Sequence, residues 1–167
     1  MTGPAKRRGR GAVQRSAALK QLSALTFDLH TEQPRFDLGP QGTRILKELI
    51  AAANAGLWVS VVILAATLVD VCMHESAQFD GMSFAGRNGG DDSAGDIQDE
   101  VFGLSYLTAT ERRQLDILRA RRNALVHYKG PVAGVSGSGG DGAALAAAAE
   151  HALLAIIPIL ENLERWG

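Results

Sequence analysis

The pattern of apolar and polar residues along this chain predicts helices throughout. Alternation with a period of two, which is typical of half-buried strands, is almost absent, whereas alanine and leucine are abundant. A first helix is predicted over residues 16–29, and a long central helix from Thr43, a residue suited to N-capping, to about Glu75. The loop between them is expected to contain the turn-forming residues Pro34, Gly39, Pro40 and Gly42.

Two further helices are predicted in the C-terminal half. Thr108 and Glu111 have the spacing of a capping box, so a helix is expected from about Ala109 to Tyr128. A final helix, kinked at Pro158, is expected over residues 143–166. Its apolar face carries Leu145, Ala149, Ala152, Ile156, Leu160 and Leu163.

The remaining segments differ in composition from the helices. Residues 76–98 are rich in Gly, Asp and Ser, and residues 130–142 are rich in Gly, so both are predicted to be loop insertions in one domain over residues 16–167. Residues 1–15 contain basic but no acidic side chains and are predicted to be a disordered basic tail. Contact of this tail with nucleic acid or an acidic partner is the alternative.

Composition limits the classes of function. The chain has 167 residues, enough for one domain, and its formal net charge of −1 gives no overall field that attracts nucleic acid. Its single cysteine, Cys72, excludes an intramolecular disulfide and a multi-cysteine zinc site, and it is expected to be a small buried side chain. This usage suits a reducing compartment, and we expect a cytoplasmic protein.

An uncharged stretch from Leu49 to Val69 is long enough to span a bilayer. It is rich in Ala and Gly and is interrupted by Asn54, Ser60 and Thr67, and charged residues flank it closely. We interpret it as the central buried helix of a soluble bundle, with a membrane span as the alternative, and expect no membrane partner.

The predicted helix over residues 109–128 carries the most informative polar residues. At about 100° per residue, its apolar residues fall on one arc, which is predicted to face the core: Leu115, Leu118, Leu125 and Val126. A separate polar strip contains Arg112, Asp116, Arg119, Asn123 and His127. Arg121 is predicted to face solvent.

Arg122 projects into the apolar arc, where an unpaired guanidinium is unfavourable. Its partner is expected to be a carboxylate, a cluster of backbone carbonyls, a ligand or a neighbouring subunit. Asp70 and Glu75, at the end of the predicted central helix, are candidates within the chain. Asn123 and His127 are four residues apart, so the amide is expected to orient the imidazole. Two copies that meet at a two-fold axis would bring two arginines and two histidines into one cleft.

The stretch R-N-A-L-V-H, from Arg122 to His127, resembles the R-x4-H motif of HEPN domains. The run LSYLTATERRQLDILRARRNALVHY, residues 104–128, also resembles a run found in many HEPN-like bundles. The resemblance implies an all-α, up-and-down bundle of four to five helices that forms a homodimer through the motif helix. Active members are metal-independent endoribonucleases, often toxins paired with a nucleotidyltransferase-like antitoxin, and neither a cofactor nor a metal is expected.

The resemblance also assigns roles to residues. Arg122 would stabilise the charge that develops on the scissile phosphate, and His127 would be the general acid or base for attack by the ribose 2′-hydroxyl. Asn123 would orient these groups, and Arg119 and Tyr128 are candidate substrate contacts. One toxin branch has a tyrosine two residues after the histidine, whereas Tyr128 follows His127 directly, so modification of this tyrosine is not assumed.

The alternative is a non-catalytic dimeric interaction or regulatory module. In that case Arg122, Asn123 and His127 form a structural polar network. Arg119, Arg112 and Arg113 could line an RNA path, but exposed helix charges are the simpler interpretation. His151 and His30 are isolated in the sequence and are interpreted as surface or core residues.

Overall fold

The structure is a computed structural model that describes residues 17–24, 38–79, 107–127 and 142–164. Within these ranges all regular structure is helical. A short helical segment at residues 17–24 precedes α2 (Gly39–Ala55), α3 (Trp58–Phe79), α5 (Ala109–His127) and α6 (Gly142–Glu164). The prediction of an all-α bundle is therefore confirmed for the described part of the chain. Residues 1–16 and most of the two predicted loop insertions lie outside it, although α3 continues to Phe79.

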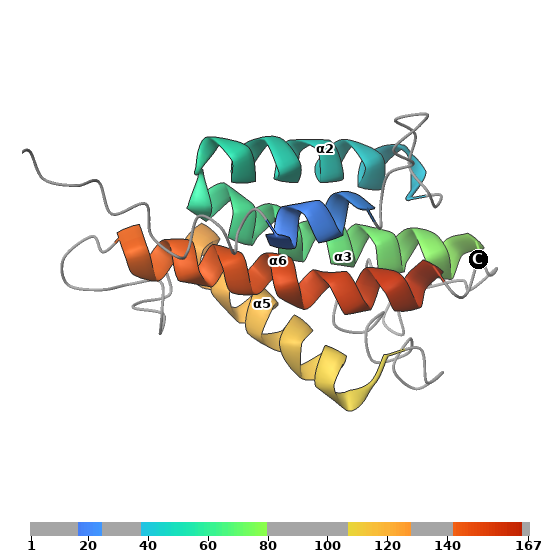
Figure 1. Cartoon of the computed structure of the whole chain (residues 1–167). Helices are drawn as coiled ribbons and strands as arrows, with labels where there is room; N and C mark the ends of the chain where they lie inside the picture. Colours follow the sequence, from blue (N-terminus) through green and yellow to red (C-terminus); the bar gives the residue numbers. More distant parts are fainter. Residues whose placement is uncertain (1–16, 25–37, 80–106, 128–141, 165–167) are drawn as a thin grey trace, which may run out of the picture.

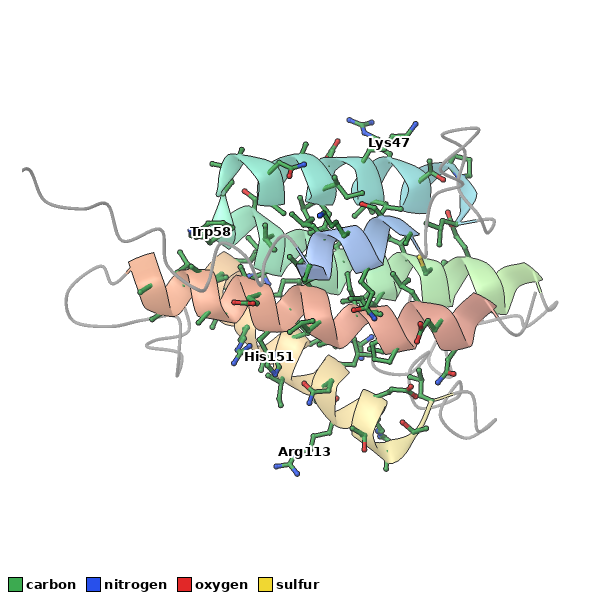
Figure 2. All side chains as sticks on the ribbon, viewed as in Figure 1. Lys47, Trp58, Arg113 and His151 are labelled. Carbon is green, nitrogen blue, oxygen red and sulfur yellow. The ribbon has the colours of Figure 1, made fainter. Side chains whose placement is uncertain are left out.

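Helix α3 is at the centre of the bundle and packs against α2, α5 and α6, while α5 also packs against α6 (Figure 1). Helices α2 and α3 form an antiparallel hairpin, and α5 lies obliquely on the opposite side of α3 from α2. Polar side chains such as that of Lys47 lie on the outer faces of the helices (Figure 2). Helix α5 therefore contacts α3 and α6 with different parts of its surface.

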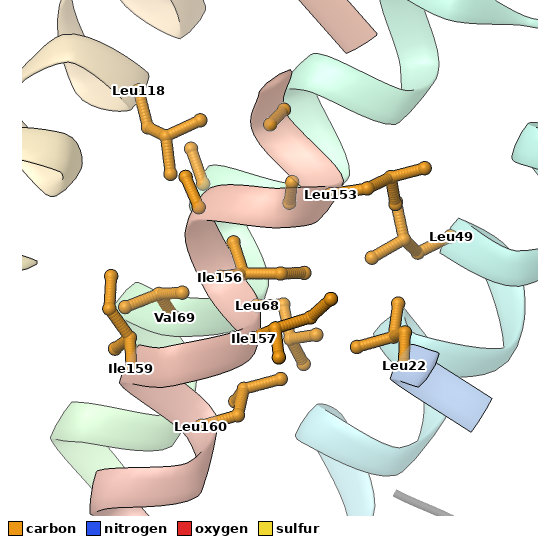
Figure 3. Close-up of a cluster of buried hydrophobic side chains, with 14 of the residues drawn as sticks. Leu22, Leu49, Leu68, Val69, Leu118, Leu153, Ile156, Ile157, Ile159 and Leu160 are labelled. Carbon is orange, nitrogen blue, oxygen red and sulfur yellow. The ribbon is translucent and has the colours of Figure 1, made fainter. Parts of the chain in front are cut away.

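One cluster of apolar side chains joins all the helical segments (Figure 3). Leu22, Leu49, Leu68, Leu118 and Ile156 come from five different segments, and each is fully buried. The packed helices α3 and α6 each contribute fully buried alanines to this cluster: Ala65, Ala66, Ala149 and Ala152. Because such interiors are close-packed, the cluster fixes the position of α5 relative to α3 and α6.

The prediction of one long central helix from Thr43 to Glu75 is wrong. Gly56 has φ 72° and ψ 24°, a left-handed conformation that ends α2, and its N–H bonds to the Ala53 carbonyl at 3.2 Å. Leu57 N–H bonds to the Ala52 carbonyl at 2.9 Å, which completes a glycine C-cap. The uncharged stretch over residues 49–69 is therefore divided between two packed helices instead of forming one continuous span.

The start of α2 also differs from the prediction. Gly39, Pro40 and Gly42, expected in a loop, belong to the first turn of α2, and Thr43 does not cap it. Proline is compatible with a first turn because its missing N–H has no intrahelical partner there. Gly39 has φ 64°, and a Cβ at this position would collide with the Glu75 carboxylate. Glycine thus permits both the backbone conformation and the close approach to α3.

Two helices are long and apolar enough to cross a membrane. These are Trp58–Glu75 of α3, of which 44% is buried inside the bundle, and Gly142–Asn162 of α6, of which 50% is buried. The core helix of a soluble protein meets the same criteria of length and composition. The two helices are therefore weak evidence for a membrane location.

Candidate functional site

Helix α5 carries the candidate residues, and its start is fixed by a capping box. The N–H of Thr108 bonds to Glu111 Oε2 at 2.7 Å, and the N–H of Glu111 bonds to Thr108 Oγ1 at 3.2 Å. The predicted box is confirmed. Glu111 is buried, and its Oε1 also accepts a bond from Asn162 Nδ2 on α6 at 2.7 Å. The sequence spacing indicated the box but not this contact with α6.

Asp70 of α3 is the partner of Arg122 and also of Arg119. Its Oδ1 accepts bonds from Arg119 Nε at 2.8 Å and Nη2 at 2.7 Å, and its Oδ2 pairs with Arg122 Nη1. The side chains of Asp70, Arg119 and Arg122 are only 11%, 12% and 23% exposed. Of the partners left open for Arg122, the structure shows a carboxylate of its own fold, and it is that of Asp70 and not of Glu75.

Arg122 is held from a second side by Asn123. Asn123 Oδ1 accepts bonds from Arg122 Nε at 3.2 Å and Nη2 at 3.1 Å. Three of the five N–H groups of Arg122 are used by Asp70 and Asn123, and two have no partner among the described residues. The guanidinium is therefore fixed in orientation while retaining donors for a further acceptor.

His127 is exposed at the end of α5. In the described part of the chain it makes no hydrogen bond or ion pair, and Asn123 bonds to Arg122 instead of orienting the imidazole as expected. Arg122 and His127 are about 140° apart around the helix, so they do not converge within one chain. The structure brings together Asp70, Arg119, Arg122 and Asn123 but leaves His127 separate.

The helix projection was accurate for the middle of α5 and wrong near its end. Leu115 and Leu118 are fully buried and Leu125 is partly buried, but Val126 is 54% exposed. Arg119, which was expected to carry an exposed charge, faces α3. The physical reason is that α5 contacts two helices, which widens its buried arc, while its last residues lie at the bundle surface.

Arg121 and His151 form a contact between α5 and α6 that sequence reasoning missed. Arg121 Nη1 lies 3.1 Å from His151 Nδ1, and both residues are partly buried. Burial lowers the pKa of His151 below its ordinary value of 6.5, and the nearby Arg121 charge lowers it further. Arg121 was expected to face solvent and His151 to be isolated; their contact depends on how α5 and α6 align, which neither segment specifies alone.

The other candidates make no site in the described residues. Arg113 points away from the bundle, whereas Arg112 is partly buried (Figure 2). No group of three or more His, Cys, Asp or Glu residues in the described ranges could hold a metal ion. Cys72 is buried as expected, and burial together with the Glu75 charge raises its pKa to about 12. Tyr128 and His30 lie outside the described residues.

No protein-family model, curated protein or solved structure matches this chain. The likeness to HEPN domains therefore rests on the motif over residues 122–127 and its helical context.

Proposed function

We propose that this chain is a metal-independent endoribonuclease of the HEPN type that acts as a homodimer, with Arg122 and His127 as its catalytic residues. The observation that carries this proposal is the contrast between the two residues. Hydrogen bonds to Asp70 and Asn123 fix the Arg122 guanidinium, which keeps two N–H groups for an acceptor. His127 is exposed one turn later and has no structural partner among the described residues.

The chemistry requires these side chains and water. The ribose 2′-oxygen attacks the adjacent phosphorus, the bond from phosphorus to the 5′-oxygen breaks, and a 2′,3′-cyclic phosphate and a free 5′-hydroxyl result. His127 accepts the 2′-hydroxyl proton while water protonates the leaving 5′-oxygen, or His127 protonates that oxygen while water accepts the 2′-hydroxyl proton. Arg122 donates to the phosphoryl oxygens as negative charge grows on them, and Asn123 holds the guanidinium in position.

A second copy completes the proposed site. Since Arg122 and His127 of one chain point about 140° apart, one helix does not present both to the same phosphate. Two motif helices related by a two-fold axis would place Arg122 of one copy beside His127 of the other. As in toxins of this type, a nucleotidyltransferase-like antitoxin encoded beside this chain is a proposed partner.

The test is an RNA-cleavage assay in the presence of a chelator. Wild-type protein is expected to cut RNA, and His127→Ala to lower the rate by about 10²–10⁴-fold, as expected for loss of a general acid or base. Arg122→Ala is expected to lower it by about 10²–10³-fold. Arg44→Ala is the control, because Arg44 is an exposed α2 residue whose only ion pair in the described chain is with Glu48.

A second candidate function is favoured by the Asp70 contacts. Asp70 joins Arg119 and Arg122 of α5 to α3, as a purely structural clamp would. Under this hypothesis the chain is a non-catalytic dimeric interaction module. It predicts no cleavage by wild-type protein, together with lower stability or loss of the dimer in Arg122→Ala. Wild-type cleavage that is lost in a stably folded His127→Ala variant would reject it.

A further inference from the structure

Among the described residues, Arg121 lacks the carboxylate partner that the structure gives to Arg44, Arg119 and Arg122. Asp70 pairs with both Arg119 and Arg122, and Glu48 pairs with Arg44. No carboxylate in the described residues pairs with Arg121, whose one recorded contact is with His151. A partly buried guanidinium without a carboxylate partner is unfavourable, so binding of an anion at this position is favoured.

The contact with His151 also determines which hydrogen-bonding groups are presented. A guanidinium is always protonated and only donates, so in the 3.1 Å contact His151 Nδ1 accepts and is unprotonated. The proton of the neutral imidazole is then on Nε2. Arg121 keeps four further N–H groups, which have no partner in the described part of the chain. The pair therefore offers donors alone, which suits an anion and not a cation.

The position of the pair relates it to the proposed active site. Arg121 and Arg122 are consecutive, about 100° apart around α5, so Arg121 reaches α6 while Arg122 reaches α3. A phosphate at Arg121 would thus lie on the adjacent side of the same helical turn as the scissile phosphate. A ribonuclease holds its substrate on both sides of the scissile phosphate. Hydrogen bonds from a protein to a nucleic acid go mostly to the phosphate–sugar backbone.

We infer that Arg121 and His151 bind a backbone phosphate of single-stranded RNA next to the scissile one, extending the substrate path from α5 onto α6. Arg121 supplies the charge and bidentate donors, and His151 supplies the Nε2 proton. This inference rests on the proposed ribonuclease function. It concerns binding of the substrate and not the chemical step, so the phosphate contact and the ribonuclease activity can be tested separately.

The experiment measures binding of a fluorescent single-stranded DNA oligonucleotide, which lacks the 2′-hydroxyl and is not cleaved. Dissociation constants are compared at several salt concentrations for wild type, Arg121→Gln, Arg121→Lys and His151→Gln. Arg121→Gln is expected to weaken binding about three- to tenfold at low salt and to reduce the slope of log K against log salt by about 0.7, the value for one phosphate contact. Arg121→Lys keeps the charge and should recover much of the affinity.

Arg44→Gln is the matched control, since it removes the same charge from an exposed position on α2. Equal weakening by Arg44→Gln and Arg121→Gln would overturn the inference, because a general loss of charge would then explain both. Unchanged affinity in both Arg121→Gln and His151→Gln would also overturn it. If wild type binds the oligonucleotide through Arg121 but cuts no RNA, the ribonuclease proposal fails while the phosphate contact stands. If wild type cuts RNA and Arg121→Gln binds and cuts equally well, only the inference fails.

Discussion

The arginine side chains on the two sides of α5 have different partners. Toward α3, Arg119 and Arg122 meet the carboxylate of Asp70 at a nearly buried position. Toward α6, the partner of Arg121 among the described residues is the imidazole of His151. Neighbouring arginines in one helical turn thus share a carboxylate on one side and have no carboxylate partner among the described residues on the other. A row of basic residues in a sequence is therefore not one uniform surface.

The largest expected effect comes from removing the shared carboxylate. Asp70→Ala leaves two nearly buried guanidinium groups without this counter-charge, so the free energy of unfolding should fall by about 3 kcal/mol. Urea denaturation measures the change. Asp70→Asn, which retains an acceptor, should be less harmful. A loss below about 0.5 kcal/mol in Asp70→Ala would show that the α3 side is not held by these ion pairs.

A smaller effect is expected at the start of α5, where the buried Glu111 accepts a hydrogen bond from Asn162 of α6. Glu111→Ala removes one half of the capping box and the acceptor of Asn162, so it should destabilise the fold by about 1–2 kcal/mol. Asn162→Ala removes the contact with α6 but leaves the box intact. Equal losses in the two variants, measured by the same denaturation, would assign the whole effect to the contact with α6.

The pH dependence of stability should reveal the contact between Arg121 and His151. Because the folded pKa of His151 lies below 6.5, the unfolded chain takes up a proton first as the pH falls. The free energy of unfolding should therefore decrease as the pH falls from 6.5 to the lowered folded pKa, with a small amplitude because the group is partly solvated. His151→Gln should flatten this part of the profile. Identical profiles in wild type and variant would contradict the assignment.

The smallest effect on stability is expected for Arg121→Ala. Arg121 has no carboxylate partner in the described residues, so its removal should change the free energy of unfolding by less than about 0.5 kcal/mol. Thermal and urea denaturation of Arg121→Ala and Asp70→Ala, measured together, compare the two sides directly. A loss in Arg121→Ala as large as that in Asp70→Ala would remove the distinction between them.

Features encoded by local spacing could be predicted from the sequence. The capping box at Thr108 and Glu111, the buried face at Leu115 and Leu118, and the need of Arg122 for a partner follow from helix geometry within one segment. The amphipathic face of the last helix is likewise confirmed at Ala149, Ala152, Ile156 and Leu160, and α6 continues past Pro158 to Glu164.

Features that depend on a single residue or on contacts between distant segments were not predicted from the sequence. The break at Gly56 was missed because the apolar pattern continues through it, and both flanking helices face the same core. The pairing of Arg121 with His151, and the sharing of Asp70 by Arg119 and Arg122, require the relative alignment of three helices. Periodicity within one helix does not contain that information.

The central claim is that a metal-independent ribonuclease site combines Arg122 of one copy with His127 of another. The most direct measurement is RNA cleavage in chelator by a purified heterodimer that contains one Arg122→Ala chain and one His127→Ala chain. Each homodimeric variant should be inactive, whereas the heterodimer retains one intact site of the two and should recover about half of the wild-type rate. An inactive heterodimer beside an active wild type would contradict the shared site, and an inactive wild type would contradict the ribonuclease itself.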